Sequence, residues 1–411
     1  MRHSVALYAS SVLGSGILVL PGLTAKMAGP ASILAWVALS FASYPFAYTF
    51  ASLSARRPES GGIYAFAREA FGVRIAAVIG WLFAFWVISG APAVTLIAAS
   101  YIGYAFPISR PETYVVAFGI IAAAFVINYR GIVVSSRVQL AVVASMIALL
   151  VATVILSAPY VRVQNFQPFM PAGPLAVGSA MALIFWSYLG YENTSNVAEE
   201  FENPERDFHR SIILSVVLIS ALYLAVAFVT IGTRAYEAGG SVAPFAAILS
   251  NALGGYAAMG TALVAAFIIF GTANAYTTGV SRLLYAVAQD GGLPRALNHL
   301  HPKTKVPDRV LIGLLSSYAI VLTIYYFSTI DLTTALLVPS GAAILVYVVG
   351  SAAGVKILGR QASHTRMNLL LPLASLAISL IVMPFIGPLL TASLTVVVAG
   401  FIYASLRQRK A

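Results

Sequence analysis

The chain has 411 residues, of which 60% are hydrophobic and only 9% are charged. A soluble domain carries roughly 25% charged residues, so too few charges are present here to cover a water-exposed surface. The composition therefore excludes a soluble enzyme or binding domain and predicts a protein embedded in a membrane.

Apolar runs long enough to form transmembrane helices recur from one end of the chain to the other. A helix needs about 20 apolar residues to cross a hydrocarbon core of roughly 30 Å. The fourth run is the shortest, and the last two are separated only by a turn at residues 384–388. We predict an all-α protein with a single transmembrane unit, 1–411, of twelve spans: 4–27, 30–54, 75–105, 113–128, 132–158, 175–199, 211–232, 256–287, 308–328, 331–354, 367–385 and 387–406.

Basic residues indicate how these spans are oriented. If the N-terminus lies inside the cell, every Lys and Arg falls in an inner loop or tail except Lys26, Arg110, Arg162 and Arg234. This bias follows the positive-inside rule and predicts a multi-pass protein of the cell membrane with both termini in the cytoplasm. Because the same sorting explains the net charge of +11, we expect no nucleic-acid partner.

Motifs for catalysis and nucleotide hydrolysis are missing. The sequence contains no cysteine and no H-E-x-x-H, G-x-S-x-G, P-loop or Rossmann motif. All five histidines fall in predicted inner loops or tails. We therefore expect no enzyme activity, metal site or cofactor, and any transport must draw on gradients of solutes or ions.

A shorter helix is predicted between the second and third spans. Residues 63–71 carry aromatic side chains at helical spacing together with Arg68 and Glu69. This pattern is typical of an amphipathic helix lying on the inner membrane surface, where we expect an anchoring role.

Glycines interrupt the first span. The stretch Gly14-Ser15-Gly16-Ile17, with Pro21 following, weakens a helix by roughly 1 kcal/mol per glycine relative to alanine. A helix break inside a membrane must face protein or water. There, the N–H groups of a half-helix attract carboxylates and loose carbonyls attract cations, which suits a zwitterion. The alternative is that Gly and Ser only allow two helices to pack closely.

The sixth span carries a matching interruption. Residues 185–193 combine aromatic bulk, one glycine and a polar cluster that includes Glu192, the one acidic residue predicted within a span. Intramembrane carboxylates are functional by default, although a protonated glutamic acid joining two helices is the alternative. The two breaks occupy equivalent positions if 1–158 and 175–354 are repeats of opposite orientation, followed by two extra helices in 367–406.

The eighth span contains a polar stretch at 271–278. Within it, Asn274 and Tyr276 are candidates for lining a pocket, and Thr277 and Thr278 for ligating sodium. The alternative for each threonine is a hydrogen bond to the carbonyl four residues earlier, which satisfies a hydroxyl at little cost.

Four segments resemble those of the amino acid–polyamine–organocation (APC) transporters. They are the stretch around Gly14-Ser15-Gly16-Ile17, the loop at 58–72, the stretch at 185–207 and the stretch at 281–294. The third segment most resembles the family's bacterial amino-acid efflux branch. The resemblance implies a LeuT-like fold, with a five-plus-five inverted repeat, broken helices one and six, and two extra C-terminal helices.

The same resemblance implies a substrate site. The substrate carboxylate would meet N–H groups around Ser15 and Gly16, its ammonium would meet carbonyls of both breaks, and aromatic side chains would cover it. Glu192 would act in coupling or gating. The implied substrate-binding residues are Ser11, Val12, Gly14, Ser15, Gly16, Ile17, Phe185, Trp186, Ser187, Tyr188, Gly190, Asn274 and Tyr276.

The expected activity is secondary active transport of neutral, hydrophobic L-amino acids by alternating access, with H+ or Na+ coupling or by exchange. Some proton-coupled relatives carry a lysine in helix five, but residues 139–157 hold no Lys or Arg. A cationic amino acid or polyamine exchanger with Glu192 as a substrate ligand is the alternative. From another class, the alternatives are a channel or a non-transporting membrane receptor. The sequence leaves import or export and the oligomeric state open.

Overall fold

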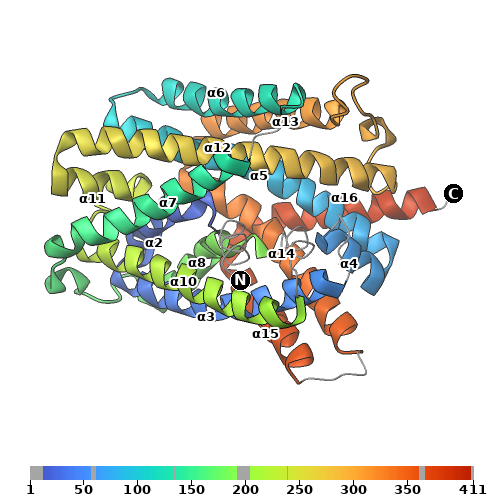
Figure 1. Ribbon diagram of the computed structural model, residues 1–411, viewed down its shortest axis with the longest axis horizontal. Coiled ribbons are helices and arrows are strands. Elements are labelled where there is room, and N and C mark those ends of the chain that lie inside the picture. The colour runs from blue at the N-terminus through green and yellow to red at the C-terminus, as the bar shows by residue number, and fades with distance from the viewer. Residues whose placement is uncertain are drawn as a thin grey trace.

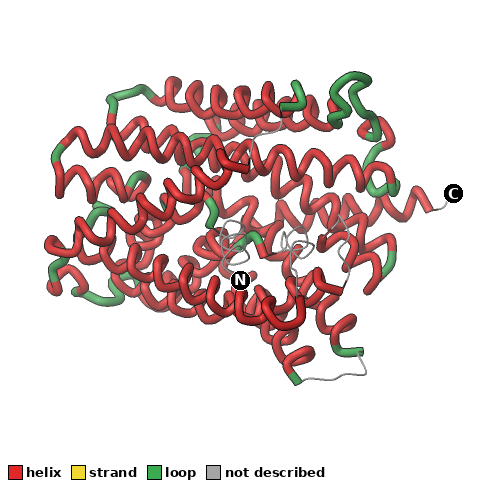
Figure 2. Tube along the Cα trace, viewed as in Figure 1, coloured by secondary structure: helices red, strands yellow, loops and turns green. Residues whose placement is uncertain are grey.

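The computed structural model of the chain is a bundle of helices that run mainly along its longest axis (Figure 1). It describes residues 13–56, 62–132, 136–191, 204–237, 239–360 and 366–408, and within these ranges it contains helices and loops but no strand (Figure 2). The α-helices are α2 (Leu20–Ala28), α3 (Ser32–Arg56), α4 (Gly62–Phe71), α5 (Val73–Ala105), α6 (Arg110–Tyr129), α7 (Ser136–Ser157), α8 (Gly173–Ile184), α10 (Pro204–Gly232), α11 (Pro244–Leu253), α12 (Gly255–Gln289), α13 (Asp308–Phe327), α14 (Leu332–Leu358), α15 (Met367–Val382) and α16 (Leu390–Gln408).

Helix lies within each of the twelve predicted ranges. Nine helical segments of the described residues are long and apolar enough to cross a membrane. Two of these segments, Leu20–Arg56 and Met367–Leu406, each cover two predicted ranges, because a short 3-10 turn joins the helices within them: η2 (Gly29–Ala31) and η9 (Met383–Leu389). The sixth range holds a shorter apolar helix, Gly173–Tyr188. The predicted all-helical membrane architecture is confirmed.

Contacts between the two halves of the chain come in reciprocal pairs. Helix α2 contacts α8, α3 contacts α10, α5 contacts α12, and α6 contacts α13. The cross-contacts match as well: α2–α10 is paired with α3–α8, α5–α13 with α6–α12, and α7–α12 with α5–α14. The most central element is α5, whose sequence is apolar on all sides, as expected of a helix surrounded by other helices.

Two short helices differ from the sequence prediction. Helix α11 was not predicted, because its 10 residues are too few to cross a membrane. Its apolar face packs on α7 and α12. Helix α4 lies where the amphipathic helix was predicted, but its apolar face, including Ile63 and Phe66, is buried against α5 and α14. That face therefore packs on protein instead of facing lipid.

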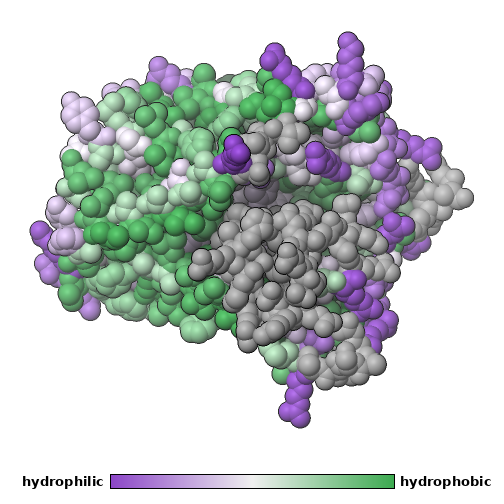
Figure 3. Space-filling view, viewed as in Figure 1, coloured by the Kyte–Doolittle hydropathy of each residue, from purple (hydrophilic) through white to green (hydrophobic). Residues whose placement is uncertain are grey.

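The surface separates apolar from polar residues along the long axis. Hydrophobic residues cover much of the left half of the visible face in Figure 3, and hydrophilic side chains gather toward the right-hand end. Figure 1 places α4 and the C-terminal end of α16 at that end. Three interactions tie the helix ends together there: Arg56 with the Ile357 carbonyl, Arg68 with Asp290, and Lys356 with the Ala70 carbonyl. We refer to this region as the basic end.

Candidate functional site

In the first predicted span, the described residues are not α-helical before Leu20. Leu13 and Gly14 are not helical, a 3-10 turn η1 (Ser15–Leu18) follows, and α2 begins at Leu20 with Pro21 in its first turn. No side chain caps the start of η1, so the first N–H groups of this turn have no intrahelical partner. Ser11 and Val12 lie outside the described residues.

In the sixth predicted span, the α-helix also ends within the predicted range. Helix α8 ends at Ile184 and passes into a 3-10 turn, η5 (Phe185–Tyr188), after which Leu189 is extended. Gly190 then adopts a φ of 123°, a conformation that residues other than glycine rarely reach. Glu192 lies outside the described residues.

The two interruptions touch each other. A Cβ atom placed on Gly16 would lie 2.7 Å from Trp186 Cδ1 and 2.8 Å from Ser187 Oγ, so only glycine allows this approach. The Ser187 hydroxyl is fully buried and has no hydrogen-bond partner among the described residues. The structure thus places η1 against η5, with Gly16 beside Trp186 and Ser187.

Three tyrosines satisfy backbone groups that the breaks release, and none of them was singled out from the sequence. Tyr101 of α5 donates a hydrogen bond to the Leu18 carbonyl. Tyr223 of α10 donates to the Ser187 carbonyl, and the Tyr347 hydroxyl of α14 accepts from the Gly190 N–H. Breaks in membrane helices are tolerated where neighbouring helices supply such partners. A tyrosine deep within an otherwise apolar span is the sequence signal that points to them.

The aromatic residues of η5 point in different directions. The half-buried Trp186 indole reaches Gly90, near the middle of α5, where a Cβ atom would lie 2.8 Å from Cη2. Tyr188 faces α3 and forms a 2.7 Å hydrogen bond with Ser40. Phe185 packs edge-on against Tyr347, with a ring-centroid distance of 5.3 Å. Of these three side chains, Trp186 is the one that packs against the break in helix one.

The polar residues of α12 make contacts with α6. Asn128 of α6 donates a 2.9 Å hydrogen bond to the Asn274 side chain and accepts a 2.6 Å bond from Thr278. Thr277 donates to the Ala273 carbonyl at 2.7 Å, which is the alternative arrangement considered for it. Tyr276 is 38% exposed. The side chains of Asn274 and Thr278 therefore link α12 to α6 through Asn128.

This link makes a measurable contribution to stability. Replacing Asn128 by Ala leaves the buried Asn274 oxygen without its donor, and we expect a loss of about 1 kcal/mol in the free energy of unfolding. Thermal unfolding of the purified protein would measure it, with Thr323→Ala on the exposed face of α13 as the control. Equal unfolding temperatures for Asn128→Ala and Thr323→Ala would contradict the prediction.

Among the described residues, no three His, Asp or Glu side chains converge as metal ligands. What the site offers instead is backbone: N–H groups at the start of η1 and carbonyls at the end of η5, beside the Ser187 hydroxyl.

A bundle with nine described helices long and apolar enough to cross a membrane is the architecture of a multi-pass membrane protein. The chain belongs to the amino acid permease family of the APC superfamily, whose family model, described as "Amino acid permease", matches residues 2–407. Its function is therefore amino acid transport and not an enzymatic reaction, and the predicted APC membership is confirmed.

Several curated proteins are similar to the chain over most of its length. An uncharacterized amino acid permease, YecA of Bacillus subtilis, is 36% identical over 359 residues, covering 87% of this chain and 85% of the relative. The L-methionine/branched-chain amino acid exporter YjeH of Escherichia coli is 29% identical, with coverage of 87% and 85%. The branched-chain amino acid permease BcaP of Bacillus subtilis is 30% identical, with coverage of 72% and 68%.

Proposed function

We propose that this permease is a secondary transporter of neutral, apolar L-amino acids that works by alternating access around its two helix breaks. The observation that carries the proposal is the contact of η1 with η5 at Gly16, Trp186 and Ser187. The uncapped N–H groups at the start of η1 lie beside η5, whose Ser187 carbonyl accepts one hydrogen bond from Tyr223 and keeps a second lone pair. A zwitterionic amino acid presents the charges that complement both groups.

The side chains at this contact favour a neutral substrate. Ile17, Phe185 and Trp186 are apolar, and Ser15 and Ser187 are small and uncharged. A charged substrate side chain would need a buried partner of opposite sign, and residues 13–18 and 185–191 contain none. Two of the relatives are named for methionine or branched-chain amino acids, which agrees with this substrate class.

The fold around the site supports alternating access. Reciprocal contacts between two sets of helices are the pattern that a two-fold axis produces, and they link the helices of 1–158 with those of 175–354. We infer that these segments form an inverted repeat of five spans each and that 367–406 supplies two additional spans. The basic end would then face the cytoplasm, together with both termini.

Counterflow in proteoliposomes tests the function and the site together. Vesicles loaded with unlabelled amino acids should take up labelled leucine and methionine faster than labelled arginine or glutamate. Trp186→Ala should slow this exchange at least about tenfold, or ~1.4 kcal/mol, because the indole joins the break in helix one to α5. Phe41→Ala, an aromatic that is 78% exposed on α3, should exchange at the wild-type rate.

Other outcomes of this assay distinguish the alternatives. Exchange of arginine or polyamines alone would favour the cationic exchanger. Wild-type exchange by Trp186→Ala would refute the site. Repeating the assay at several pH values, with and without sodium, identifies the coupling ion.

A further inference from the structure

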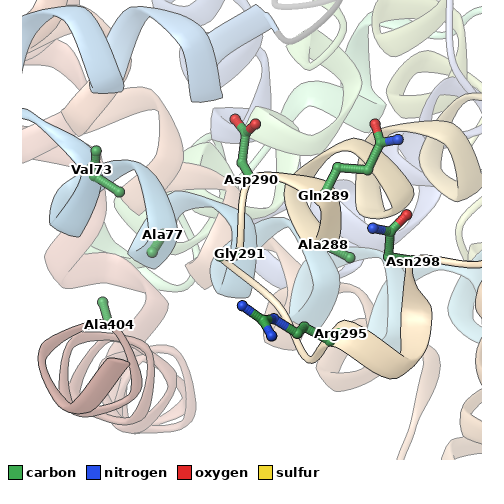
Figure 4. A pocket seen from close by; sticks show the side chains of 10 residues that line it. Val73, Ala77, Ala288, Gln289, Asp290, Gly291, Arg295, Asn298 and Ala404 are labelled. Atoms are coloured by element: carbon green, nitrogen blue, oxygen red, sulfur yellow. The ribbon is translucent and has the colours of Figure 1, made fainter. Parts of the chain in front are cut away.

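A cavity of about 540 Å³ opens at the basic end, away from the helix breaks. Figure 4 shows its walls: Val73 and Ala77 of α5 and Ala404 of α16 lie on one side, and the loop that follows α12 lies on the other. Gln289, Arg295 and Asn298 supply its polar side chains. The cavity is therefore apolar toward the spans and polar toward the loop.

The charges around this cavity favour an anion. The Arg295 side chain is exposed and makes no hydrogen bond or ion pair with the described residues, and in Figure 4 it extends toward α5 and α16. Asp290 also lines the cavity, but its carboxylate already pairs with Arg68 at 2.9 Å. Burial of the Tyr64 hydroxyl, and to a smaller extent the negative charge of Asp290, raises the pKa of Tyr64 to about 12. This phenol therefore stays neutral beside Arg68 and Asp290. Among the described residues that line the cavity, Arg295 is therefore the charge without a partner of opposite sign.

The start of α5 adds hydrogen-bond donors at the same place. This helix of 33 residues begins after Gly72 without a side-chain cap and without an acidic residue in its first turn. Its first N–H groups have no intrahelical partner, and the helix dipole places partial positive charge there. Val73, in this first turn, lines the cavity.

An apolar strip leads away from the cavity. Val73 is 45% exposed, and near Ala404 on α16 the side chains of Phe401, Ile402 and Leu406 are 45%, 52% and 58% exposed. These residues suit contact with acyl chains, while Arg295 suits a phosphate, as basic pockets between membrane helices do for anionic headgroups.

We propose that this cavity binds the phosphate group of an anionic phospholipid, with Arg295 as its charged ligand and the acyl chains lying along α16. The site is separate from the substrate path and does not depend on which amino acid is carried. A soluble phosphate ester would present the same charged group without the chains.

Native mass spectrometry of the detergent-purified protein tests this site. Wild type should retain phosphatidylglycerol in preference to phosphatidylcholine. Removing one basic residue at a membrane surface weakens binding about fivefold, so Arg295→Gln should lose this preference. Lys303→Gln removes the same charge from an exposed position of the same loop outside the cavity and should retain it. Thermal unfolding would confirm that both variants are folded.

The comparison has outcomes that overturn the proposal. Equal retention of phosphatidylglycerol by wild type and Arg295→Gln, or no preference over phosphatidylcholine in wild type, would exclude the site. A third arm adds glycerol phosphate, which lacks acyl chains, and follows thermal unfolding. If it stabilises wild type as strongly as phosphatidylglycerol does, and only when Arg295 is present, the phosphate site stands and the lipid is the wrong source.

Discussion

Alanine at Gly16 should slow amino acid exchange at least about tenfold, or ~1.4 kcal/mol in the transport barrier, while the protein still folds. The added Cβ would lie 2.7 Å from Trp186 Cδ1 and 2.8 Å from Ser187 Oγ. The indole has little room to retreat, because its far edge packs closely against Gly90 of α5, where an added Cβ atom would lie 2.8 Å from Cη2. The two helix breaks must therefore separate, and the N–H groups and carbonyls would no longer face one substrate. Counterflow with labelled leucine measures the effect.

A matched control separates this contact from a general effect of alanine. Gly119 lies on the exposed face of α6, and a Cβ atom there would meet nothing within 4 Å. Gly119→Ala should therefore exchange at the wild-type rate. Gly90→Ala presses on the same indole from the opposite side and should resemble Gly16→Ala. Normal exchange by Gly16→Ala would mean that the close approach is not needed, and the proposed site would fall.

The sequence was informative where a local backbone property decides the structure. Glycines at 14, 16 and 190 weaken a helix wherever they occur, and the structure departs from α-helix at η1 and beyond η5. The positions of the spans can also be predicted from the sequence, because length and apolarity decide which segments can cross a membrane. Helix α11 is apolar but has only 10 residues, too few to cross a membrane, and was missed. It is apolar because it packs on other helices, and a short apolar run does not reveal that.

Side-chain direction could not be predicted, because it depends on how each helix is rotated within the bundle. Tyr188 and Trp186 are two residues apart in the same turn, yet Tyr188 bonds to Ser40 and Trp186 packs on Gly16. Asn274 was predicted as a candidate for lining a pocket, and the sequence did not indicate its hydrogen-bond partner, Asn128. In the same way, Tyr101, Tyr223 and Tyr347 come from three different helices and converge on the breaks only in the folded chain.

The C-terminal helices are expected to position the site, although their sequence is simply apolar. Gly178 of α8 packs against Phe385 of η9, and a Cβ atom on Gly178 would overlap three atoms of that ring. We expect Gly178→Ala to lower the free energy of unfolding by about 1–3 kcal/mol, the typical effect of overpacking. Thermal unfolding in detergent measures it, and Gly119→Ala again serves as the control.

A second substitution tests whether the ring is the cause. Phe385→Ala removes the atoms that the new Cβ meets, so the double variant should be more stable than the sum of the two single effects predicts. If the stability losses of the two single variants simply add, the contact with Phe385 is not the cause of the loss in Gly178→Ala. Since α8 leads directly into η5, a shift of α8 away from η9 also moves Trp186 relative to Gly16. The stabilised double variant should therefore recover exchange along with stability, which would tie the last two helices to the geometry of the substrate site.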